Sequence, residues 1–303
     1  MTWTVEEVAI DSPLLDQAAF TCAQRLVQEG YENILVLVAK KDGVPQAALV
    51  ASMFIYLFKA EIEHLALYEN ATDPTGMQAL LSKAETRFQK YHITIAVFLF
   101  SETRHDKIEL EKQLYDSAWS RPKPMIRQYF IDIASLKPNW LLQERRLPLG
   151  YELFSWTELT KSEQRRIKVQ ANQGYYPYDV FPYGRSGNPH SLTSVGLRAE
   201  GKVIGWMATH QIDPLTLAYS ALYIDAAWRA QKLSMNLLTE AIRRHKATSI
   251  PNAYFKLNLK RISDDWYSFV KEGLAPHAYR IEDILISQKR VPKIKPQSKI
   301  PSG

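Results

Sequence analysis

The chain has 303 residues, of which 46% are hydrophobic and 23% are charged, as is typical of a globular protein of about two domains. Its longest apolar runs reach strand length, which excludes a membrane-spanning helix of roughly 20 apolar residues. The single cysteine, Cys22, excludes an internal disulfide and predicts a reducing, cytoplasmic setting. The formal net charge is +6, and residues 289–303 contribute basic residues to it without any acidic one.

The first half predicts alternating strands and helices. One helix is expected between Ser12 and Gly30, followed by two strands around a turn at Asp42-Gly43. A further strand, EIEHLALY, precedes a helix with an apolar face at helical spacing. That face consists of Met77, Leu80, Leu81, Ala84 and Phe88. The strand TIAVFLF, a helix over residues 106–117 and a strand pair around MIRQYFIDI complete this half.

The second half repeats the same order. A hairpin with its turn at Glu200-Gly201 is followed by the strand TLAYSALYI and an amphipathic helix. The strand AYFKLNL, the helix DDWYSFVKEG and the closing strand YRIEDILISQ come next. The apolar face of the amphipathic helix consists of Leu233, Leu237, Leu238, Ala241, Ile242 and His245.

The spacing between corresponding features indicates a duplicated domain. Gly43 lies 158 positions before Gly201, and the pair Leu80-Leu81 lies 157 positions before Leu237-Leu238. A nearly constant offset across different element types is the signature of an internal repeat. We therefore predict one domain over residues 1–136, a linker over 137–150, and a second domain over 151–290. Residues 291–303 are expected to form a disordered, basic, Pro-rich tail.

A basic turn joins the strand TLAYSALYI to the amphipathic helix of the second half. Arg229 and Lys232 stand in this turn, immediately before the helix begins. Free N–H groups and the helix dipole favour an anion at such a position. The turn therefore predicts a phosphate-binding site, although solvated basic residues at a helix start are a common alternative.

The order of elements, together with this turn, resembles the GNAT acetyltransferase superfamily, and the whole chain resembles a tandem GNAT protein. The resemblance implies an α/β fold with two mixed, mostly antiparallel sheets flanked by helices. In that family the turn is usually Arg/Gln-x-x-Gly-x-Gly/Ala and holds the pyrophosphate of acetyl-CoA, while the preceding strand pairs with the pantetheine arm. Here RAQKLS places Arg229 at the first position, Lys232 at the first glycine and Ser234 at the second.

The resemblance implies that the second half uses acetyl-CoA or another acyl-CoA as co-substrate, without a metal. The expected cofactor-binding residues are Leu222, Tyr223, Ile224, Arg229, Ala230, Gln231, Lys232, Leu233 and Ser234. The equivalent turn of the first half, ATDPTGM, offers Asp73 where a cation would help, and its Gly76 is one position out of register. The first half is therefore expected to keep the fold and to have lost the cofactor.

Catalytic residues are less clearly indicated. GNAT enzymes often carry a glutamate on the strand before the turn and a tyrosine four residues before a Gly-Phe pair; here that strand has no glutamate, and Phe269 stands four residues before Gly273. The expected candidates are the tyrosines Tyr219, Tyr223 and Tyr267, for which half-buried packing is the alternative.

The acceptor side is predicted from an aromatic segment over residues 172–191. Its position in the GNAT plan makes Tyr175, Tyr176 and Tyr178, together with His210, candidate substrate-binding residues; a loop held by its own aromatic packing is the alternative. The predicted function is N-acyl transfer to an amine of a small molecule or peptide, with a non-catalytic GNAT-like binding protein as the rival. No metal-ligand spacing, nucleic-acid motif or membrane segment supports another class, and the oligomeric state stays open.

Overall fold

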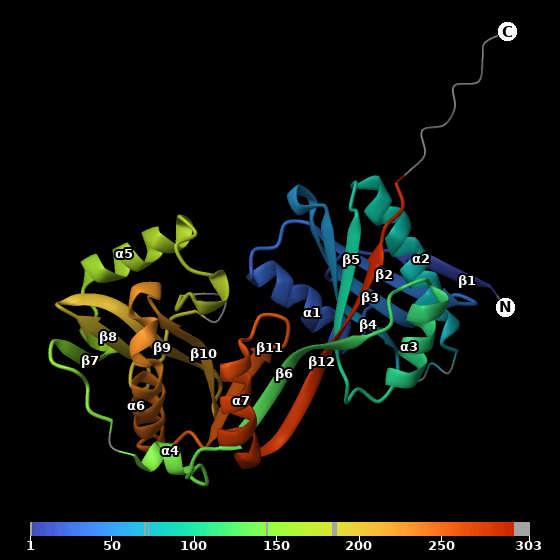
Figure 1. The fold of residues 1–303 in the computed structure, drawn as a ribbon. Helices are drawn as coiled ribbons and strands as arrows, with labels where there is room; N and C mark the ends of the chain where they lie inside the picture. Colours follow the sequence, from blue (N-terminus) through green and yellow to red (C-terminus); the bar gives the residue numbers. More distant parts are fainter. Residues whose placement is uncertain (1, 70, 72, 144, 184–186, 294–303) are drawn as a thin grey trace. The chain divides into compact units, whose positions relative to one another are not determined.

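The computed structural model describes residues 2–69, 71, 73–143, 145–183 and 187–293. The described residues divide into two compact units, one of residues 2–125 with 283–293 and the other within residues 126–282. Each unit contains a mixed sheet with helices on both of its faces (Figure 1). Among the described residues, no helix is long and apolar enough to cross a membrane.

The sheet of the first unit has the strand order β1-β2-β3-β4-β5-β12. Only β4 and β5 are parallel, and the other neighbours are antiparallel. The elements are β1 (Trp3–Glu7), α1 (Gln17–Gln28), β2 (Ile34–Lys41), β3 (Val44–Phe54), η1 (Ile55–Leu57), β4 (Lys59–Leu67), α2 (Thr75–Lys90), β5 (Ile95–Ser101), α3 (Lys107–Asp116) and β12 (Ala278–Arg290).

The second unit repeats this plan with the strand order β7-β8-β9-β10-β11-β6. Only β10 and β11 are parallel. The strands are β6 (Lys123–Asp132), β7 (Tyr151–Ser155), β8 (Val195–Ala199), β9 (Lys202–Asp213), β10 (Thr216–Ile224) and β11 (Asn252–Asn258). The helices are α4 (Asn139–Leu142), η2 (Trp156–Glu158), α5 (Lys161–Asn172), η3 (Tyr178–Val180), η4 (Ala226–Gln231), α6 (Ser234–Lys246), α7 (Asp264–Gly273) and η5 (Ala275–His277).

The two units exchange their closing strands. Residues 126–132 of β6 pair with β11 of the second unit, whereas residues 284–290 of β12 pair with β5 of the first unit. The division of the sequence into consecutive domains does not anticipate this exchange. The stretch MIRQYFIDI was expected to form a strand pair, and this is wrong, because it lies in the single long strand β6.

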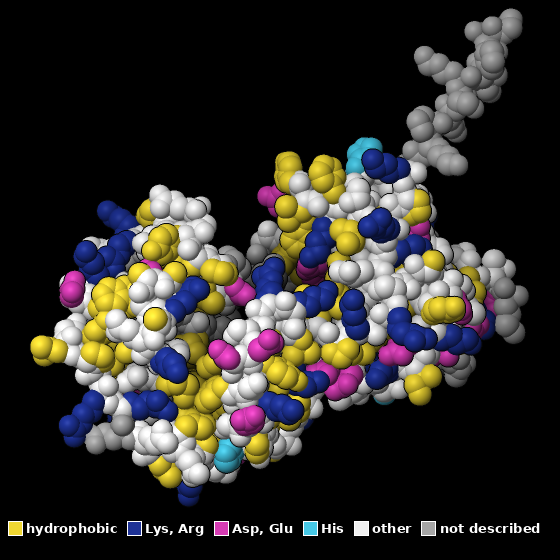
Figure 2. All heavy atoms as spheres, in the orientation of Figure 1, with side chains coloured by type: hydrophobic (Ala, Val, Ile, Leu, Met, Phe, Trp, Pro, Cys, Tyr) yellow, Lys and Arg dark blue, Asp and Glu magenta, His cyan; other side chains and the backbone are white. Residues whose placement is uncertain are grey.

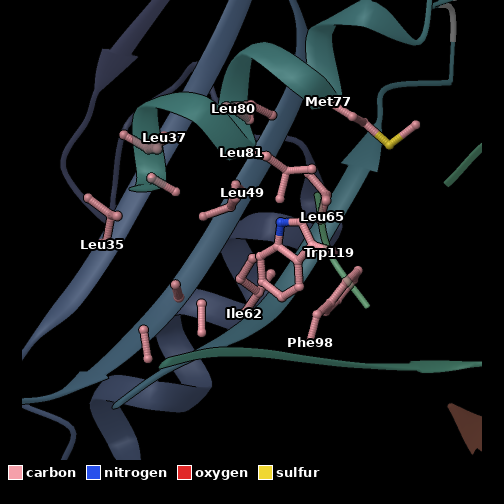
Figure 3. Close-up of a cluster of buried hydrophobic side chains, with 14 of the residues drawn as sticks. Leu35, Leu37, Leu49, Ile62, Leu65, Met77, Leu80, Leu81, Phe98 and Trp119 are labelled. Carbon is pink, nitrogen blue, oxygen red and sulfur yellow. The ribbon is translucent and has the colours of Figure 1, made fainter. Parts of the chain in front are cut away.

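Apolar side chains pack on both faces of each sheet. The predicted face of α2 is confirmed, because all five of its apolar residues are buried between α2 and the sheet (Figure 3). On the opposite face, Ala19, Ala23 and Leu26 of α1 pack against β2 and β3. In the second unit α6 buries its predicted face, and α5 covers the other side of the sheet.

Both predicted hairpin turns are present. Asp42 and Gly43 have φ values of 51° and 87°, and Glu200 and Gly201 have values of 50° and 74°. Two successive positive φ values are typical of the type I′ turn, whose twist suits a two-residue hairpin. Matching turns in corresponding hairpins support the duplication.

The predicted tail begins later than expected. Val291 is buried in the core of the first unit, and its N–H donates to the Thr94 carbonyl at 3.0 Å. Residues 294–303 of the predicted tail lie outside the described residues.

Candidate functional site

In the second unit, the two parallel strands of the sheet separate. β10 and β11 pair only over Thr216–Ala218 and Asn252–Tyr254. A register shift between Tyr219 and Ala221 on β10 marks the point where β10 departs from regular pairing with β9. Because β11 pairs with β6 on its other side, the opening lies between two strands that are each held in a sheet. Beyond the split, the backbone N–H and C=O groups of β10 that face β11 can pair with the polar groups of a ligand.

A cavity of about 450 Å³ occupies this opening. Its accessible side is bordered by Ser220 and Leu222 of β10, Lys256 and Asn258 of β11, and Trp266 of α7. Hydrophobic side chains are visible in the space-filling view between the positions of α6 and α7 (Figure 2). An apolar cavity with a few polar groups at its border is the usual form of a small-molecule site.

The turn after β10 keeps the backbone conformation of a glycine turn although it contains none. Lys232 has φ = 54°, in the left-handed region, and its N–H donates to the Arg229 carbonyl at 3.1 Å. Helix α6 then begins at Ser234 with no side-chain cap on its first N–H groups. Residues 229–232 are exposed. The first turn of α6 therefore presents free N–H groups beside two cations, which is a favourable position for a phosphate.

Arg229 is fixed close to the strand. Its Nε donates to the Ile224 carbonyl at 3.1 Å, at the end of β10. Asp225 begins the turn by accepting from the Ala227 N–H at 3.2 Å. These contacts set the direction of the turn and leave the terminal guanidinium nitrogens of Arg229 able to bind an anion.

A second hollow, of about 680 Å³, adjoins the first turn of α6 at Met235. Trp140 and Phe269 meet edge to face in it, with ring centroids 5.3 Å apart. The Nε atom of Arg145 is buried there and has no partner among the described residues. Its polar lining consists of Lys137, Asn139, Gln143, Arg145, Glu272 and His277. Aromatic rings and cations around one hollow suit a nucleotide with a phosphate.

Of the three candidate catalytic tyrosines, only Tyr219 lines the cavity. Its hydroxyl is 3.0 Å from Nδ1 of His245, whose Nε2 is 3.0 Å from the Ile250 carbonyl. Because Nε2 must donate to that carbonyl, Nδ1 accepts the Tyr219 proton. Burial raises the pKa of Tyr219 and lowers that of His245 to about 4. The pair is therefore a neutral donor and acceptor near pH 7.

The other two tyrosines lie elsewhere in the unit. Tyr223 packs in the core on the α5 side, with its ring centroid 4.6 Å from that of Trp206, and burial raises its pKa to about 12. Tyr267 lies on α7, packed against the core beside α6. Neither is among the residues that line the cavity.

The residues expected to contact the acceptor lie in different environments. Tyr176 is only 5% exposed, packs against Trp206 and Tyr223, and donates to the Ile167 carbonyl, so its position is that of a core residue. His210 is also buried; its Nε2 donates to the Pro182 carbonyl at 3.1 Å, and burial lowers its pKa. The aromatic segment therefore holds itself in place, as the alternative interpretation expected.

Tyr175 is the exposed member of this set. Its hydroxyl donates to Asp225 at 2.8 Å, and this hydrogen bond raises the pKa of the tyrosine. The contact ties the aromatic segment to the basic turn that contains Arg229 and Lys232. Tyr178 begins η3, but its side chain lies outside the described part of the structure.

The corresponding positions in the first unit are filled by the unit's own side chains. Asp73 accepts from the N–H and hydroxyl of Thr75 at the start of α2, and it forms an ion pair with Lys41 at 2.7 Å. Lys41 and Thr75 lower the pKa of this carboxyl to about 2. A Cβ on Gly76 would come within 2.7 Å of the Trp3 ring. An internal carboxylate and an indole therefore cover the end of α2 where an anion would bind.

The split between β4 and β5 is also occupied. These strands pair over Lys59–Ile62 and then diverge. Nη2 of Arg104 donates to the Leu65 carbonyl at 2.9 Å, on the diverging part of β4, and to Asp106 at 2.6 Å. This supports the expectation that the first half keeps the fold without the cofactor.

Sequence reasoning missed several residues around the cavity. Asp179 of η3 and Arg261, after β11, form an ion pair at 3.9 Å, and both line the cavity. Lys256 and Trp266 also contribute to the lining. Arg261 and Trp266 follow the carboxyl end of β11, the strand that flanks the split, and this position is the sequence signal that could have identified these two residues.

No family model and no curated protein matches the chain in sequence. Solved structures do match it. A tandem GNAT protein from the clavulanic acid biosynthesis pathway has a TM-score of 0.66 and 13% identity over 97% of this chain and 100% of its own. A GCN5-related N-acetyltransferase from Sphaerobacter thermophilus has a TM-score of 0.58 and 10% identity over 96% and 97% of the two chains. The chain has a tandem GNAT fold.

A third structure shows the same fold within a longer protein. A glucosamine N-acetyltransferase region of a fungal multi-domain β-N-acetylglucosaminidase has a TM-score of 0.57 and 12% identity, covering 95% of this chain and 38% of that one. These identities are low, so the likeness concerns the fold. Within this GNAT fold, the open split and the basic turn both lie in the second unit.

Proposed function

We propose that the second unit binds an acyl-CoA and transfers its acyl group to an amine of a small molecule or peptide. The observation that carries this proposal is the open split between β10 and β11. It contains a cavity and lies next to an uncapped helix N-terminus bracketed by Arg229 and Lys232.

The three parts of acyl-CoA have corresponding surfaces in this unit. The amide groups of the pantetheine arm can pair with the free edge of β10 beside Leu222. The pyrophosphate can bind the first N–H groups of α6 together with Arg229 and Lys232. The nucleotide can lie in the hollow that contains Trp140 and Arg145, next to the same helix turn. The three surfaces therefore lie in the same order as the pantetheine, pyrophosphate and nucleotide groups of acyl-CoA.

Bound acyl-CoA would supply the thioester carbonyl that the amine attacks, with the amide bond forming as the carbon–sulfur bond breaks. The attacking ammonium must first lose a proton. Asp179 is the carboxylate that lines the cavity, and we assign it the role of accepting this proton. Tyr219 stays protonated near pH 7, so it can orient groups in the cavity but cannot act as the base.

A binding role without chemistry is the second candidate. It is favoured by the absence of a glutamate on β10 and by the use of the Tyr219 hydroxyl as a donor to His245. The two candidates differ in turnover. With acetyl-CoA and a panel of primary amines, an enzyme releases CoA thiol in an amine-dependent manner, whereas a binding protein is stabilised by CoA and releases none.

Thermal unfolding with CoA and acetyl-CoA tests the shared step, which is binding. At about 100 times the dissociation constant, a ligand adds about 2.7 kcal/mol of stability. The double variant Arg229→Glu with Lys232→Glu should lose this gain, because two attractive charges become repulsive beside the pyrophosphate.

A matched control changes the same number of charges on another helix. Lys161→Glu with Arg165→Glu on α5 alters two exposed basic residues and should keep the ligand-induced shift. Absence of any shift for the unaltered protein at low salt would refute the proposal. An equal loss in both double variants would show that net charge, and not the turn, controls binding.

A further inference from the structure

Three charged residues line the accessible side of the cavity. They are Asp179 on η3, Lys256 on β11 and Arg261 in the turn after β11, and all three are exposed. On β11, Phe255 and Leu257 pack in the core beside α6. Because successive side chains of a strand alternate between its faces, Lys256 points to the face opposite α6. We refer to the three charged residues as the charged border of the cavity.

Hydrogen bonds fix the short segments that carry Asp179 and Arg261. The Val180 carbonyl accepts from Nε1 of Trp206 at 2.9 Å, which holds η3 against the core on the α5 side. The Arg261 N–H donates to the Asn258 carbonyl at 3.0 Å, in the turn that follows β11. Nη1 of Arg261 and Oδ2 of Asp179 are 3.9 Å apart. An anion and a cation are therefore neighbours at the charged border.

Lys256 gives the charged border one positive charge in excess. Across the residues that the structure describes, no acidic side chain forms an ion pair with it. The side chains of Asp179 and Arg261 are both more than half exposed, and an exposed pair at this distance contributes little to stability. Both partners can therefore exchange this contact for the charged groups of a ligand. A ligand that carries a cation and an anion close together would match all three residues.

We propose that the acceptor amine is that of a free α-amino acid, whose ammonium binds Asp179 and whose carboxylate binds Arg261 and Lys256. This inference rests on the proposed function, because the same amine attacks the thioester. One carbon separates the two charged groups of an α-amino acid, which suits neighbouring charges of opposite sign on the protein. The N-terminus of a peptide has no carboxylate on that carbon, so the inference narrows the acceptor to the free amino acid.

The transfer step balances with these groups. One ammonium proton passes to Asp179, and the amine nitrogen forms a bond to the thioester carbonyl carbon. The carbon–sulfur bond then breaks, and the second proton that the nitrogen loses neutralises the thiolate of CoA. Arg261 and Lys256 take no part in the proton transfer; they hold the carboxylate, and so orient the amine toward the carbonyl carbon.

Calorimetric titration in the presence of CoA measures acceptor binding without turnover. Leucine, phenylalanine and serine are each compared with the decarboxylated amine, which is isoamylamine, phenethylamine or ethanolamine, and with the dipeptide that ends in glycine. At about pH 6.5 all of these carry an ammonium. We expect each amino acid to bind about tenfold more tightly than its two counterparts, because they lack the carboxylate that makes charge-assisted contacts to two cations.

Exposed substitutions connect this preference to the charged border. Lys256→Met and Arg261→Gln should each reduce the preference to about threefold, and the double variant should reduce it to less than about twofold. Lys260→Met is the matched control, because Lys260 is an exposed cation in the same turn that does not line the cavity. It should keep the tenfold preference. Asp179→Asn should weaken binding of the decarboxylated amines, which keep only the ammonium contact.

The outcomes separate this inference from the function on which it rests. If amines or dipeptides bind as tightly as amino acids, or if the double variant keeps the preference, the inference is overturned, and amine-dependent release of CoA thiol still supports the proposed function. If no probe binds while CoA does, the inference is also overturned. If the preference is present and depends on Lys256 and Arg261 but no CoA thiol is released, the amino-acid site stands and the transfer step fails. If CoA itself does not bind, the proposed function fails, and the same titrations without CoA decide whether the amino-acid site exists.

Discussion

Lys232 adopts a backbone conformation that glycine adopts more readily. Its φ of 54° places it in the left-handed region, where a Cβ approaches backbone atoms. The sequence identified this position as the departure from the glycine-containing GNAT turn. The structure indicates that the turn geometry is kept and that a lysine pays its conformational cost while adding a charge at the helix N-terminus.

Two substitutions separate the conformation of Lys232 from its charge. Lys232→Gly removes the Cβ and should raise the free energy of unfolding by up to about 1 kcal/mol, since relief of left-handed strain exceeds the added chain entropy. Lys232→Ala keeps the strain and should give no such gain. Both lose the same charge, so both should weaken CoA binding by about two- to fivefold. Urea unfolding and calorimetry measure the two effects; equal stabilisation by alanine would contradict the strain argument.

The buried pair Tyr219–His245 predicts a defined acid sensitivity. The pKa of His245 is about 4 in the folded protein, against 6.5 for an unperturbed histidine, because burial disfavours its charged form. Below pH 6.5 the unfolded chain therefore binds a proton that the folded chain does not. The stability associated with this residue is complete above pH 6.5 and is lost as the pH falls toward 4.

This sensitivity is measured by urea unfolding at several pH values between 7 and 4. The double variant Tyr219→Phe with His245→Leu removes the donor, the acceptor and the titrating group together. Its free energy of unfolding should fall less steeply between pH 6.5 and 4 than that of the unaltered protein. A direct control is the NMR titration of the His245 ring, which should remain neutral at pH 5.5; protonation near pH 6.5 would contradict the structure.

At the scale of elements, α2 and α6 occupy corresponding positions in the two units, but side chains cover the N-terminus of α2 and leave that of α6 accessible. The N-cap residues of both helices, Pro74 and Leu233, make no side-chain cap hydrogen bond, but Asp73 accepts from the first N–H group of α2 and Trp3 covers Gly76. The sequence predicted this difference between the N-termini of α2 and α6, because an acidic residue precedes α2 and basic residues precede α6. The covering indole was not predicted, since it comes from β1, far away in sequence.

Element prediction succeeded where periodicity dominates. The buried faces of α2 and α6 and both hairpin turns follow from local patterns. The environment of each residue in the aromatic segment was harder to predict. Tyr175 and Tyr176 are adjacent residues of the same type, yet Tyr176 is buried and Tyr175 is exposed. The cavity residues Asp179 and Arg261 lie on short connecting segments, whose positions depend on tertiary packing and not on periodicity.

Arg104 provides a test of the closed split in the first unit. Arg104→Ala removes the donor to the Leu65 carbonyl and the partner of Asp106, which leaves both groups without their hydrogen bonds. We expect the free energy of unfolding to fall by about 1–3 kcal/mol. The partly exposed i,i+4 ion pair of Lys107 with Glu111 is the control, and Lys107→Ala should cost less than about 1 kcal/mol. Similar losses in the two variants would show that Arg104 does not close the split.

At the scale of the whole molecule, the exchange of closing strands makes each unit depend on both ends of the chain. Leu285 of β12 and the adjacent Val291 are buried in the first core, whereas Tyr129 and Ile131 of β6 are buried in the second. Lys289 of β12 also forms an ion pair with Glu85 of α2. The exchange was not predictable, because the strand pattern of β6 or β12 indicates a strand but not its partner.

Cutting the chain between residues 136 and 137 tests this dependence. A fragment of residues 1–136 would leave β5 unpaired at the seven positions where β12 binds, and β6 without β11. Exposed strand edges promote aggregation, so we expect this fragment to be insoluble alone. Co-expressed with residues 137–303, it should be recovered in a soluble complex, because each fragment supplies the strand that the other lacks.

A rejoined chain gives the matched control. Residues 1–125 followed by a flexible linker and residues 283–293 contain the first unit with its own closing strand, and loop closure over a short linker costs little. This chain should fold cooperatively in urea, whereas residues 1–136 should not. If residues 1–136 are soluble and unfold cooperatively, β6 can replace β12 beside β5, and the side-chain contacts of Leu285 and Lys289 do not enforce the exchange.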